Sequence, residues 1–200
     1  MGRATPGREM KMADGTTTEI FYNGVPAAEM RNPYGLQKLG VESVKPIITK
    51  GIFIDLAGYK ELNTLPEDYL ITMSDIRNTL VKEGLKESDI EPGDALLFNI
   101  GWWRLWPGKK TVEGKPAYAD KEVIEWIIAK RPSMIGSDAS LDGPEFHLHE
   151  ELILKNGIFN LEFMNFESIQ SEKQYKFLFL LTPLRLKGAT GSPCRPLAIF

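Results

Sequence analysis

The chain has 200 residues, of which 42% are hydrophobic and 26% charged, and this composition is typical of one folded domain. It excludes disorder as the main description of the chain. With 24 Lys and Arg residues against 27 Asp and Glu residues, the net charge of −3 leaves no basic surface for a phosphate backbone. We therefore expect no nucleic-acid partner.

Neither a membrane segment nor a secretory signal is visible in the sequence. The longest apolar runs, such as 177–181, are far shorter than the roughly 20 residues needed to cross a bilayer, and residues 1–15 lack an apolar signal segment. The single cysteine, Cys194, excludes an intramolecular disulfide and a cysteine-rich zinc site. These features predict a cytoplasmic protein without a membrane partner.

The first part of the chain is polar and shows neither helical nor strand periodicity. We interpret residues 1–20 as an extended N-terminal arm or loop and residues 21–200 as a single α/β domain. The segment 27–39 can form only a short helical turn, because Pro33 and Gly35 interrupt it.

Two strands are predicted in the middle of the chain. Residues 45–57 are apolar and β-branched, which indicates a buried strand, and Gly51 within them marks a bulge or a close backbone approach. Residues 95–103 form a continuous apolar run after the turn residues 91–94, which is typical of a central strand.

Two amphipathic helices flank the second of these strands. Thr72 and Asp75 have the spacing of a capping box, and the helix that they begin runs to Gly84. Asp120 caps the other helix. The apolar residues that recur at helical spacing are Ile76, Leu80 and Val81 in the first helix and Val123, Ile124, Ile127 and Ile128 in the second.

The last third of the chain predicts a short strand at 133–137, a helix at 146–156 that Gly157 ends, and strands at 158–164 and 174–186. Strands that alternate with helices indicate an α/β domain with a mixed β-sheet and flanking helices.

The chain contains only two histidines, His147 and His149. On a helix their side chains would point apart by about 200°, so only one of them would enter a given site. A metal role for this pair competes with a solvated helix start, and the sequence leaves both open.

Glu162 lies in an apolar strand and shares a face with Asn160. A carboxylate in such surroundings must be paired, protonated or bound to a metal, because an isolated buried charge is too costly. The alternative is an edge strand with Glu162 in water.

Other candidate site residues follow predicted strands. Asp138 comes directly after the strand at 133–137 and can face a crevice, whereas Asp142 suits a helix cap or a turn. Trp102, with Trp103 and Trp106 nearby, can line an aromatic pocket or belong to a core or an interface. Arg195, in the glycine-rich loop 187–195, can hold a carboxylate, although a structural turn explains this loop equally well. Cys194 lacks a His and Asp arrangement for a nucleophile.

Several segments together resemble the cyclase family of metal-dependent hydrolases, which includes kynurenine formamidases and isatin hydrolases. These segments are FYNG (21–24), KPIITKGIFIDLAGYK (45–60), EPGDALLFNIGW (91–102), IGSDAS (135–140), HEELILKNGIFNLEFMNF (149–166) and PLRLKGATGSPCRPLAI (183–199). The resemblance implies a swivelling β/β/α fold, a homo-oligomer such as a dimer or tetramer, and hydrolysis of amide or cyclic amide C–N bonds of a small molecule. It also implies a divalent metal, zinc or manganese.

Carried onto this sequence, the family's later metal ligands match His149 and Glu162, with His147 as the alternative to His149. Asp138, Trp102 and Arg195 are the expected substrate-binding residues. The family's N-terminal His-x-Gly-Thr-His-x-Asp-x-Pro-x-His motif has no counterpart, and we expect the sequence to begin just after the place of this motif. We therefore expect an impaired hydrolase with an incomplete metal site, or alternatively a catalytically degenerate binding or structural module; a truncated chain is a third explanation.

Overall fold

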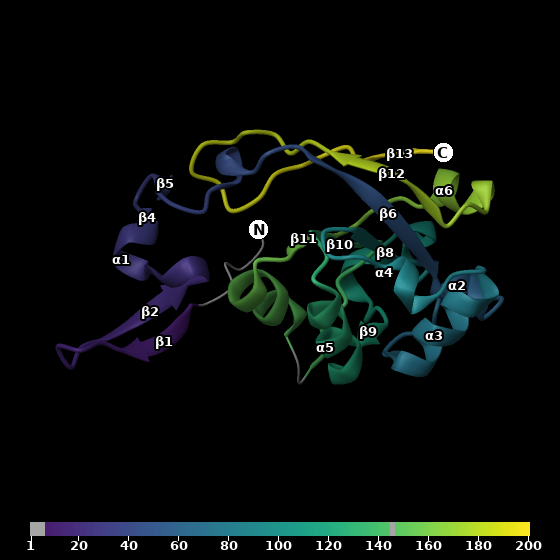
Figure 1. Cartoon of the computed structure of the whole chain (residues 1–200), viewed down its shortest axis with the longest axis horizontal. Helices are drawn as coiled ribbons and strands as arrows, with labels where there is room; N and C mark the ends of the chain where they lie inside the picture. Colours follow the sequence, from purple (N-terminus) through teal and green to yellow (C-terminus); the bar gives the residue numbers. More distant parts are fainter. Residues whose placement is uncertain (1–6, 145–146) are drawn as a thin grey trace.

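The computed structural model describes residues 7–144 and 147–200. Its largest feature is a six-stranded sheet with the order β11-β10-β8-β6-β12-β13 (Figure 1). The strands are β6 (Ile47–Asp55), β8 (Ala95–Asn99), β10 (Met134–Ser137), β11 (Phe159–Leu161), β12 (Lys176–Leu181) and β13 (Leu197–Ile199). The strands β6, β8, β10 and β11 run parallel, whereas β12 is antiparallel to both of its neighbours. The predicted mixed α/β fold with flanking helices is confirmed.

Helices cover one face of the parallel strands (Figure 1). They are α3 (Met73–Lys82), α5 (Lys121–Lys130) and η5 (Glu150–Lys155), a π-helical segment. Leu80, Ile124 and Leu152 from these helices belong to one buried cluster with Ile54 and Phe98 of the sheet. Burying a large apolar side chain contributes roughly 1.5–3 kcal/mol, so this layer fixes the positions of the strand ends.

A second buried cluster lies on the opposite face. Phe166 and Ile169, at and within α6 (Glu167–Glu172), pack with Phe53 and Phe179 of the sheet. The rings of Phe53 and Phe166 meet edge to face with their centroids 5.2 Å apart. The sequence patterns did not predict α6, because this six-residue helix is too short to show a clear helical periodicity of apolar residues.

The helix ends agree with the predicted caps. Thr72 and Asp75 form a reciprocal capping box at the start of α3, and the Asp120 side chain accepts a hydrogen bond from the Val123 N–H at the start of α5. Val81 is exposed, contrary to its predicted place on the apolar stripe, because the neighbouring Leu80 occupies the buried side. The helix expected at 146–156 is present from Leu148 to Asn156, and Phe146 lies outside the described residues.

The strands differ from the expected ranges at their ends. β8 stops at Asn99, because Gly101 adopts a left-handed conformation (φ 81°) and leads into η4 (Trp102–Leu105). Gly51 allows a close approach, as expected, because a Cβ there would collide with the ring of Phe177. β11 covers only the centre of the predicted strand, so Glu162 lies one residue beyond its end.

Residues 8–26 form a small antiparallel sheet instead of the expected arm or loop. Its strands are β1 (Arg8–Lys11), β2 (Thr17–Phe21) and β3 (Val25–Pro26). Asp14 accepts hydrogen bonds from the backbone N–H and the hydroxyl of Thr16, which closes the turn between the first two strands. A local polar turn thus created a hairpin that hydrophobic periodicity alone did not reveal.

Short elements complete the chain. They are η1 (Tyr22–Gly24), α1 (Ala27–Met30), β4 (Arg31–Asn32), β5 (Gly35–Leu36), η2 (Val41–Ser43), α2 (Leu56–Tyr59), β7 (Leu70–Ile71), η3 (Glu87–Asp89), α4 (Lys110–Glu113) and β9 (Tyr118–Ala119). In the part of the chain that the structure describes, no helix is long and apolar enough to cross a membrane.

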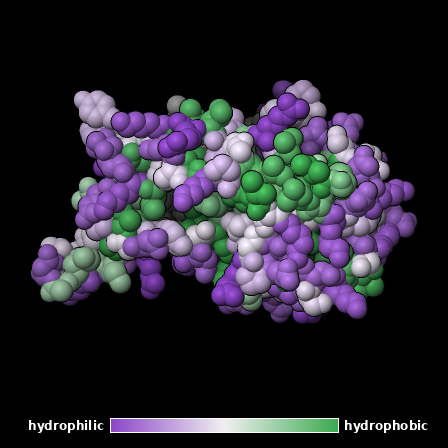
Figure 2. Space-filling model, turned by 45° about the horizontal axis from the view of Figure 1, so that its top comes forward, coloured by the Kyte–Doolittle hydropathy of each residue, from purple (hydrophilic) through white to green (hydrophobic). Residues whose placement is uncertain are grey.

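The outer strands carry an exposed apolar face. Ile48, Leu178, Leu197 and Ile199 are each between 45% and 64% exposed. The register places Leu178 opposite Ile199, so these side chains lie together on β6, β12 and β13. Figure 2 shows apolar side chains gathered on this side of the molecule.

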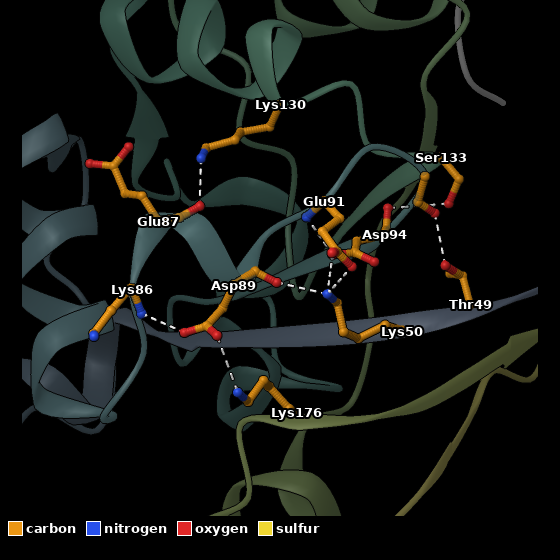
Figure 3. Close-up of polar contacts among 11 residues, drawn as sticks. Thr49, Lys50, Lys86, Glu87, Asp89, Glu91, Asp94, Lys130, Ser133 and Lys176 are labelled. Atoms are coloured by element: carbon orange, nitrogen blue, oxygen red, sulfur yellow. Dashed lines mark hydrogen bonds and ion pairs between the residues drawn. The ribbon is translucent and has the colours of Figure 1, made fainter.

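A network of charges ties the amino ends of β8 and β10 to β6 and β12 (Figure 3). The Lys50 ammonium contacts Glu91 at 2.9 Å and Asp94 at 3.1 Å, and it donates to the backbone oxygen of Asp89. The Asp89 carboxylate in turn pairs with Lys176. This end of the sheet is therefore closed by paired charges.

Candidate functional site

Polar side chains gather where the parallel strands end. Asp55 is the last residue of β6 and Asn99 the last of β8, while Asp138 follows β10 and Glu162 follows β11. The carboxyl ends of parallel strands share one edge of a sheet, and ligands of α/β proteins bind at such an edge. The candidate site therefore lies here.

His149 meets two carboxylates near this edge. Its Nδ1 atom lies 2.5 Å from Oδ2 of Asp142, and its Nε2 atom lies 3.5 Å from Oε1 of Glu162. The Asp142 carboxylate also accepts a hydrogen bond from the backbone N–H of His149. Asp142 therefore holds both the backbone and the ring of His149, and the ring directs Nε2 toward Glu162.

The charges of this trio reinforce one another. The hydrogen bond that the His149 ring donates to Asp142 raises the pKa of His149 above its ordinary value, and the negative charge of Glu162 adds to the effect. Burial on its own would raise the pKa of Asp142, but the hydrogen bonds from His149 hold that pKa below its usual range. The trio is thus an electrostatically favourable arrangement in which Asp142 stays ionised.

Asn160, in the middle of the three-residue strand β11, completes the group. Its Nδ2 atom lies 3.2 Å from Nε2 of His149 and 3.3 Å from Oε1 of Glu162. Its Oδ1 atom is buried and has no hydrogen-bond partner among the described residues. The side chains of Asn160 and Glu162 both face His149, as the alternation along a strand predicted.

The donor atoms suit a divalent cation, although the group is small. Among the described residues, no cluster of three or more His, Cys, Asp and Glu side chains is arranged to hold a metal ion. Two such donors nevertheless converge, Nε2 of His149 and Oε1 of Glu162. Metal-binding histidines typically donate their other ring N–H to a carboxylate, and Asp142 accepts in this way here. The unpartnered oxygen of Asn160 lies in the same group.

A cavity of about 360 Å³ has Phe163, the residue that follows Glu162 in the chain, in its wall, but neither Glu162 nor His149 is among the residues that line it. Its walls include the aromatic side chains of Trp103, Trp106 and Phe163, and Asp138 also lines it. Both carboxylate oxygens of Asp138 accept backbone hydrogen bonds, from Ile100 at 2.9 Å and from Trp103 at 3.1 Å. This cavity is suited to a flat molecule of modest size.

Burial dominates the electrostatics of Asp138, whose side chain is almost completely enclosed. It raises the pKa of Asp138 to about 6, although the hydrogen bonds from the N–H groups of Ile100 and Trp103 oppose the rise. Near neutral pH this carboxyl group can therefore change its protonation state when the surroundings change.

A second cavity, of about 370 Å³, lies at the end of β6 and is lined by residues that include Asp55, Glu83 and Tyr175. Burial raises the pKa of Glu83 to about 8, and the nearby charge of Asp55 adds to the rise. Gln170 donates to Asp55 and accepts a hydrogen bond from Arg104, a residue of the first cavity. The two cavities are therefore linked by one side chain of α6.

The structure brings together only some of the predicted site residues. His149 and Glu162 meet, and Asp138 lines the first cavity. His147 is exposed. Trp102 is only 1% exposed and belongs to the core. Its neighbours Trp103 and Trp106 line the first cavity.

Two residues of the loop 187–195 can also be placed. Arg195 is exposed, whereas Arg104 is the arginine that lines the first cavity. Burial raises the pKa of the Cys194 thiol, which disfavours the thiolate and agrees with the expectation that Cys194 is no nucleophile.

Sequence reasoning missed other members of the site. Asp142 was assigned to a cap or turn, and it does accept a backbone hydrogen bond at the start of a helix, but it also binds the ring of His149. Asn160 was placed on the correct face without a role. Asp55 and Glu83 received no role; the position of Asp55 at the end of an apolar run was the available signal.

Comparison with known proteins supports the family resemblance. The model of the family described as Putative cyclase matches residues 21–142. The solved structure of a novel cyclase is 28% identical with a TM-score of 0.79, and the match covers 90% of this chain and 64% of that one. No curated protein sequence matches the chain.

More distant structures share the fold. An isatin hydrolase bound to the product analogue thioisatinate is 19% identical with a TM-score of 0.59, and the match covers 75% of this chain and 59% of that one. A predicted metal-dependent hydrolase from Bacillus stearothermophilus is 18% identical with a TM-score of 0.55, and the corresponding shares are 75% and 62%. The chain thus spans between 59% and 64% of the length of these three structures.

The family match ends at Asp142, before His149 and Glu162, so the candidate metal ligands rest on the geometry described above. Glu162 nevertheless follows β11, which belongs to the same six-stranded sheet as the strands of the matched region. Because the family match covers more than half of the chain, this chain belongs to the family described as Putative cyclase.

Proposed function

We propose that the chain is a hydrolase of amide or cyclic amide C–N bonds in a small molecule, with a divalent cation, zinc or manganese, held by His149 and Glu162. The observation that carries the proposal is the convergence of Nε2 of His149 and Oε1 of Glu162, with Asp142 behind the ring. When bound, a divalent cation polarises the carbonyl under attack and lowers the pKa of a coordinated water.

The chain's own residues orient the site. The Nδ1–H of His149 donates to Asp142, so the lone pair of Nε2 is directed toward Glu162. The Glu162 carboxylate supplies negative charge from a side chain that is 21% exposed. The fixed ring and the partly buried carboxylate give the cation two donors of different chemistry.

The first cavity, whose lining does not include the proposed metal ligands, suits a flat apolar substrate. Trp103, Trp106 and Phe163 offer aromatic surfaces for stacking, and Asp138 offers a carboxyl group that can accept or donate a proton. In this proposal Trp103 and Trp106, and not Trp102 as expected from the sequence, are the tryptophans that contact the substrate. Arg104 takes the place of Arg195 as the cation at the cavity.

We expect little or no turnover by this chain alone. Catalytic zinc usually has three protein ligands, whereas only one imidazole and one carboxylate converge here. The family's acid–base histidine also has no counterpart, because the second histidine, His147, is exposed. Assays of N-formylkynurenine and isatin with added zinc or manganese test this expectation. A kcat of about 1 s⁻¹ or more, typical of an ordinary enzyme, would contradict it.

Metal binding itself tests the proposed site. Isothermal titration with Mn²⁺ should show one site in the natural chain, and H149A and E162Q should each weaken it at least tenfold. H147A is the matched control and should leave the affinity unchanged. Equal losses of Mn²⁺ affinity in H147A and H149A would contradict the assignment of the metal site to His149.

A second candidate is a binding or structural module that keeps the fold without catalysis. The finding that favours it is the lack, among residues 7–144 and 147–200, of a larger cluster of metal-ligating side chains. Elemental analysis of the purified protein separates the two candidates, since stoichiometric bound metal counts against the module. Assembly into a dimer or tetramer stays a prediction, which light scattering after size exclusion would check.

A further inference from the structure

The side chain of Asn160 lies between the two proposed metal ligands. Its Nδ2 atom is 3.2 Å from Nε2 of His149 and 3.3 Å from Oε1 of Glu162. An amide nitrogen carries two donor hydrogens and no lone pair to offer. The NH₂ group therefore sits against two acceptors at the position where a cation would join them.

The other end of the same amide is unsatisfied. Oδ1 of Asn160 is buried and has no hydrogen-bond partner among the described residues. An unpaired buried carbonyl oxygen bears its full desolvation cost, and such a group in a native structure calls for an explanation. This arrangement is therefore only half favourable, with the nitrogen paired and the oxygen unpaired.

Rotation about the Cβ–Cγ bond by 180° exchanges the two atoms of the amide, which have nearly the same size and shape. The oxygen would then face His149 and Glu162. Three acceptor atoms that face one another repel one another when no cation is present. Around a bound cation the same arrangement is favourable. The orientation with the nitrogen inward suits the metal-free chain, and the opposite orientation suits a bound cation.

We propose that Asn160 is the third protein ligand of the divalent cation, binding it through Oδ1. This inference rests on the proposed function, because it needs His149 and Glu162 as the other two ligands. It raises the set to one imidazole nitrogen and two oxygens, which is the number of protein ligands that catalytic sites keep. Amide and carboxylate oxygens are ligands that suit manganese, so Mn²⁺ is the matching probe.

The test compares Mn²⁺ binding to the purified full chain and its variants by isothermal titration, with the free Mn²⁺ signal in electron paramagnetic resonance as a second readout. N160A should weaken binding at least tenfold, because a ligand is removed. N160D should strengthen it about tenfold, because a carboxylate replaces the neutral oxygen. N156A is the matched control, since the side chain of Asn156 is exposed and donates only to the Glu151 backbone oxygen.

Thermal unfolding in EDTA and in Mn²⁺ checks that the variants fold and gives an independent readout. N160D brings a third carboxylate close to Asp142 and Glu162, so its Tm should fall in EDTA and rise on adding Mn²⁺ by more than that of the natural chain. N160A should show a smaller rise than the natural chain.

The outcomes separate the two claims. If N160A and N160D bind Mn²⁺ with the affinity of the natural chain while H149A and E162Q lose it, Asn160 is not a ligand and the proposed metal site stands. If the natural chain binds no Mn²⁺, or if H149A binds it unchanged, both the site and the role of Asn160 are overturned.

Discussion

At the amino end of β8 carboxylates face a cation, whereas at the carboxyl ends of β6 and β10 they face backbone N–H groups and one another. Lys50 contacts Glu91 and Asp94 at the first end (Figure 3). At the second end Asp138 is held by two backbone N–H groups, and the Glu83 carboxylate accepts the backbone N–H of Asp55.

The pKa of Glu91 at the amino end shifts in the opposite direction to the pKa values of Asp138 and Glu83 at the carboxyl end. The hydrogen bond from Lys50 holds the pKa of Glu91 below its ordinary value. Burial instead raises the pKa of Asp138 to about 6 and that of Glu83 to about 8. One end therefore stabilises its ionised acids, and the other keeps two acids close to a change of protonation.

Buried polar atoms without a hydrogen-bond partner also distinguish the two ends. Oε2 of Glu83 and Oδ1 of Asn160 are buried without a hydrogen-bond partner among the described residues, and both belong to the carboxyl end. Side chains that lack partners in the chain are free to bind a ligand. The comparison agrees with the proposal that the carboxyl end binds a ligand, whereas the acids of the amino end are paired with cations.

The largest expected effect is at the amino end. K50M removes the cation 3.1 Å from Asp94, whose side chain is only 6% exposed, and should destabilise the chain by about 3 kcal/mol in urea unfolding. K38M, whose partner Glu29 is exposed, is the control and should have little effect. Equal effects of the two variants would contradict a stabilising network.

At the carboxyl end, E83Q should stabilise the chain at high pH. The folded pKa of Glu83, about 8, exceeds the unfolded value of 4.5, so its contribution to stability is complete below pH 4.5 and is lost as pH rises toward 8. Glutamine keeps the acceptor for the N–H of Asp55 and removes the charge. The free energy of unfolding at pH 8 should rise by about 2 kcal/mol, with little change at pH 4.5.

Replacement of Glu87 by glutamine is a contrasting test of the prediction for E83Q. Hydrogen bonds from Trp126 and Arg77 hold the pKa of Glu87 below 4.5, so its contribution is present above that pH and is lost on acidification. E87Q should therefore lower stability at pH 8, the opposite sign to E83Q. Urea midpoints that move in the same direction for both variants would refute the distinction between the two ends.

A smaller effect on Mn²⁺ binding is expected at Asp142, which contacts the ring of the proposed ligand His149. D142N keeps an acceptor for the His149 ring but removes the charge, and should weaken Mn²⁺ binding about tenfold, or roughly 1.4 kcal/mol. D120N is the matched control, because asparagine caps α5 as well as aspartate does. An unchanged Mn²⁺ affinity in D142N would show that Asp142 does not orient His149 for a metal.

The smallest effect is expected at the rim of the amino-end network. Lys176 pairs with Asp89 at 3.4 Å, and the Lys176 side chain is 49% exposed. K176A should leave the urea midpoint unchanged, since exposed ion pairs contribute little. A loss as large as that of K50M would mean that the network acts as one unit.

Patterns within a few residues were sufficient to predict α3 and α5. The Thr72 capping box, the Asp120 cap and the apolar stripe of α5 involve groups within one or two turns, so local chemistry decides them. The run at 95–103 predicted a central strand but not its end, because the left-handed turn at Gly101 depends on a close approach to the backbone of Asn63.

The candidate site was only partly predictable. The strand alternation placed Asn160 and Glu162 on one face, and the family resemblance selected His149 and Glu162. The tertiary structure alone brings the Asp142 carboxylate to the ring of His149, seven positions further along the chain, and no local sequence pattern encodes that contact.

The sequence by itself determined the α/β class, the helix starts and the polar residues that follow apolar strands, because periodicity and caps depend on neighbours in the chain. Tertiary structure alone decided which of those residues meet. Glu83, directly after α3, contacts Asp55 across 28 positions of the chain, and Asn160 contacts His149 across 11 positions. Such contacts form only after the sheet and its helices have packed, since burial in the assembled core brings these side chains together and raises or lowers their pKa values.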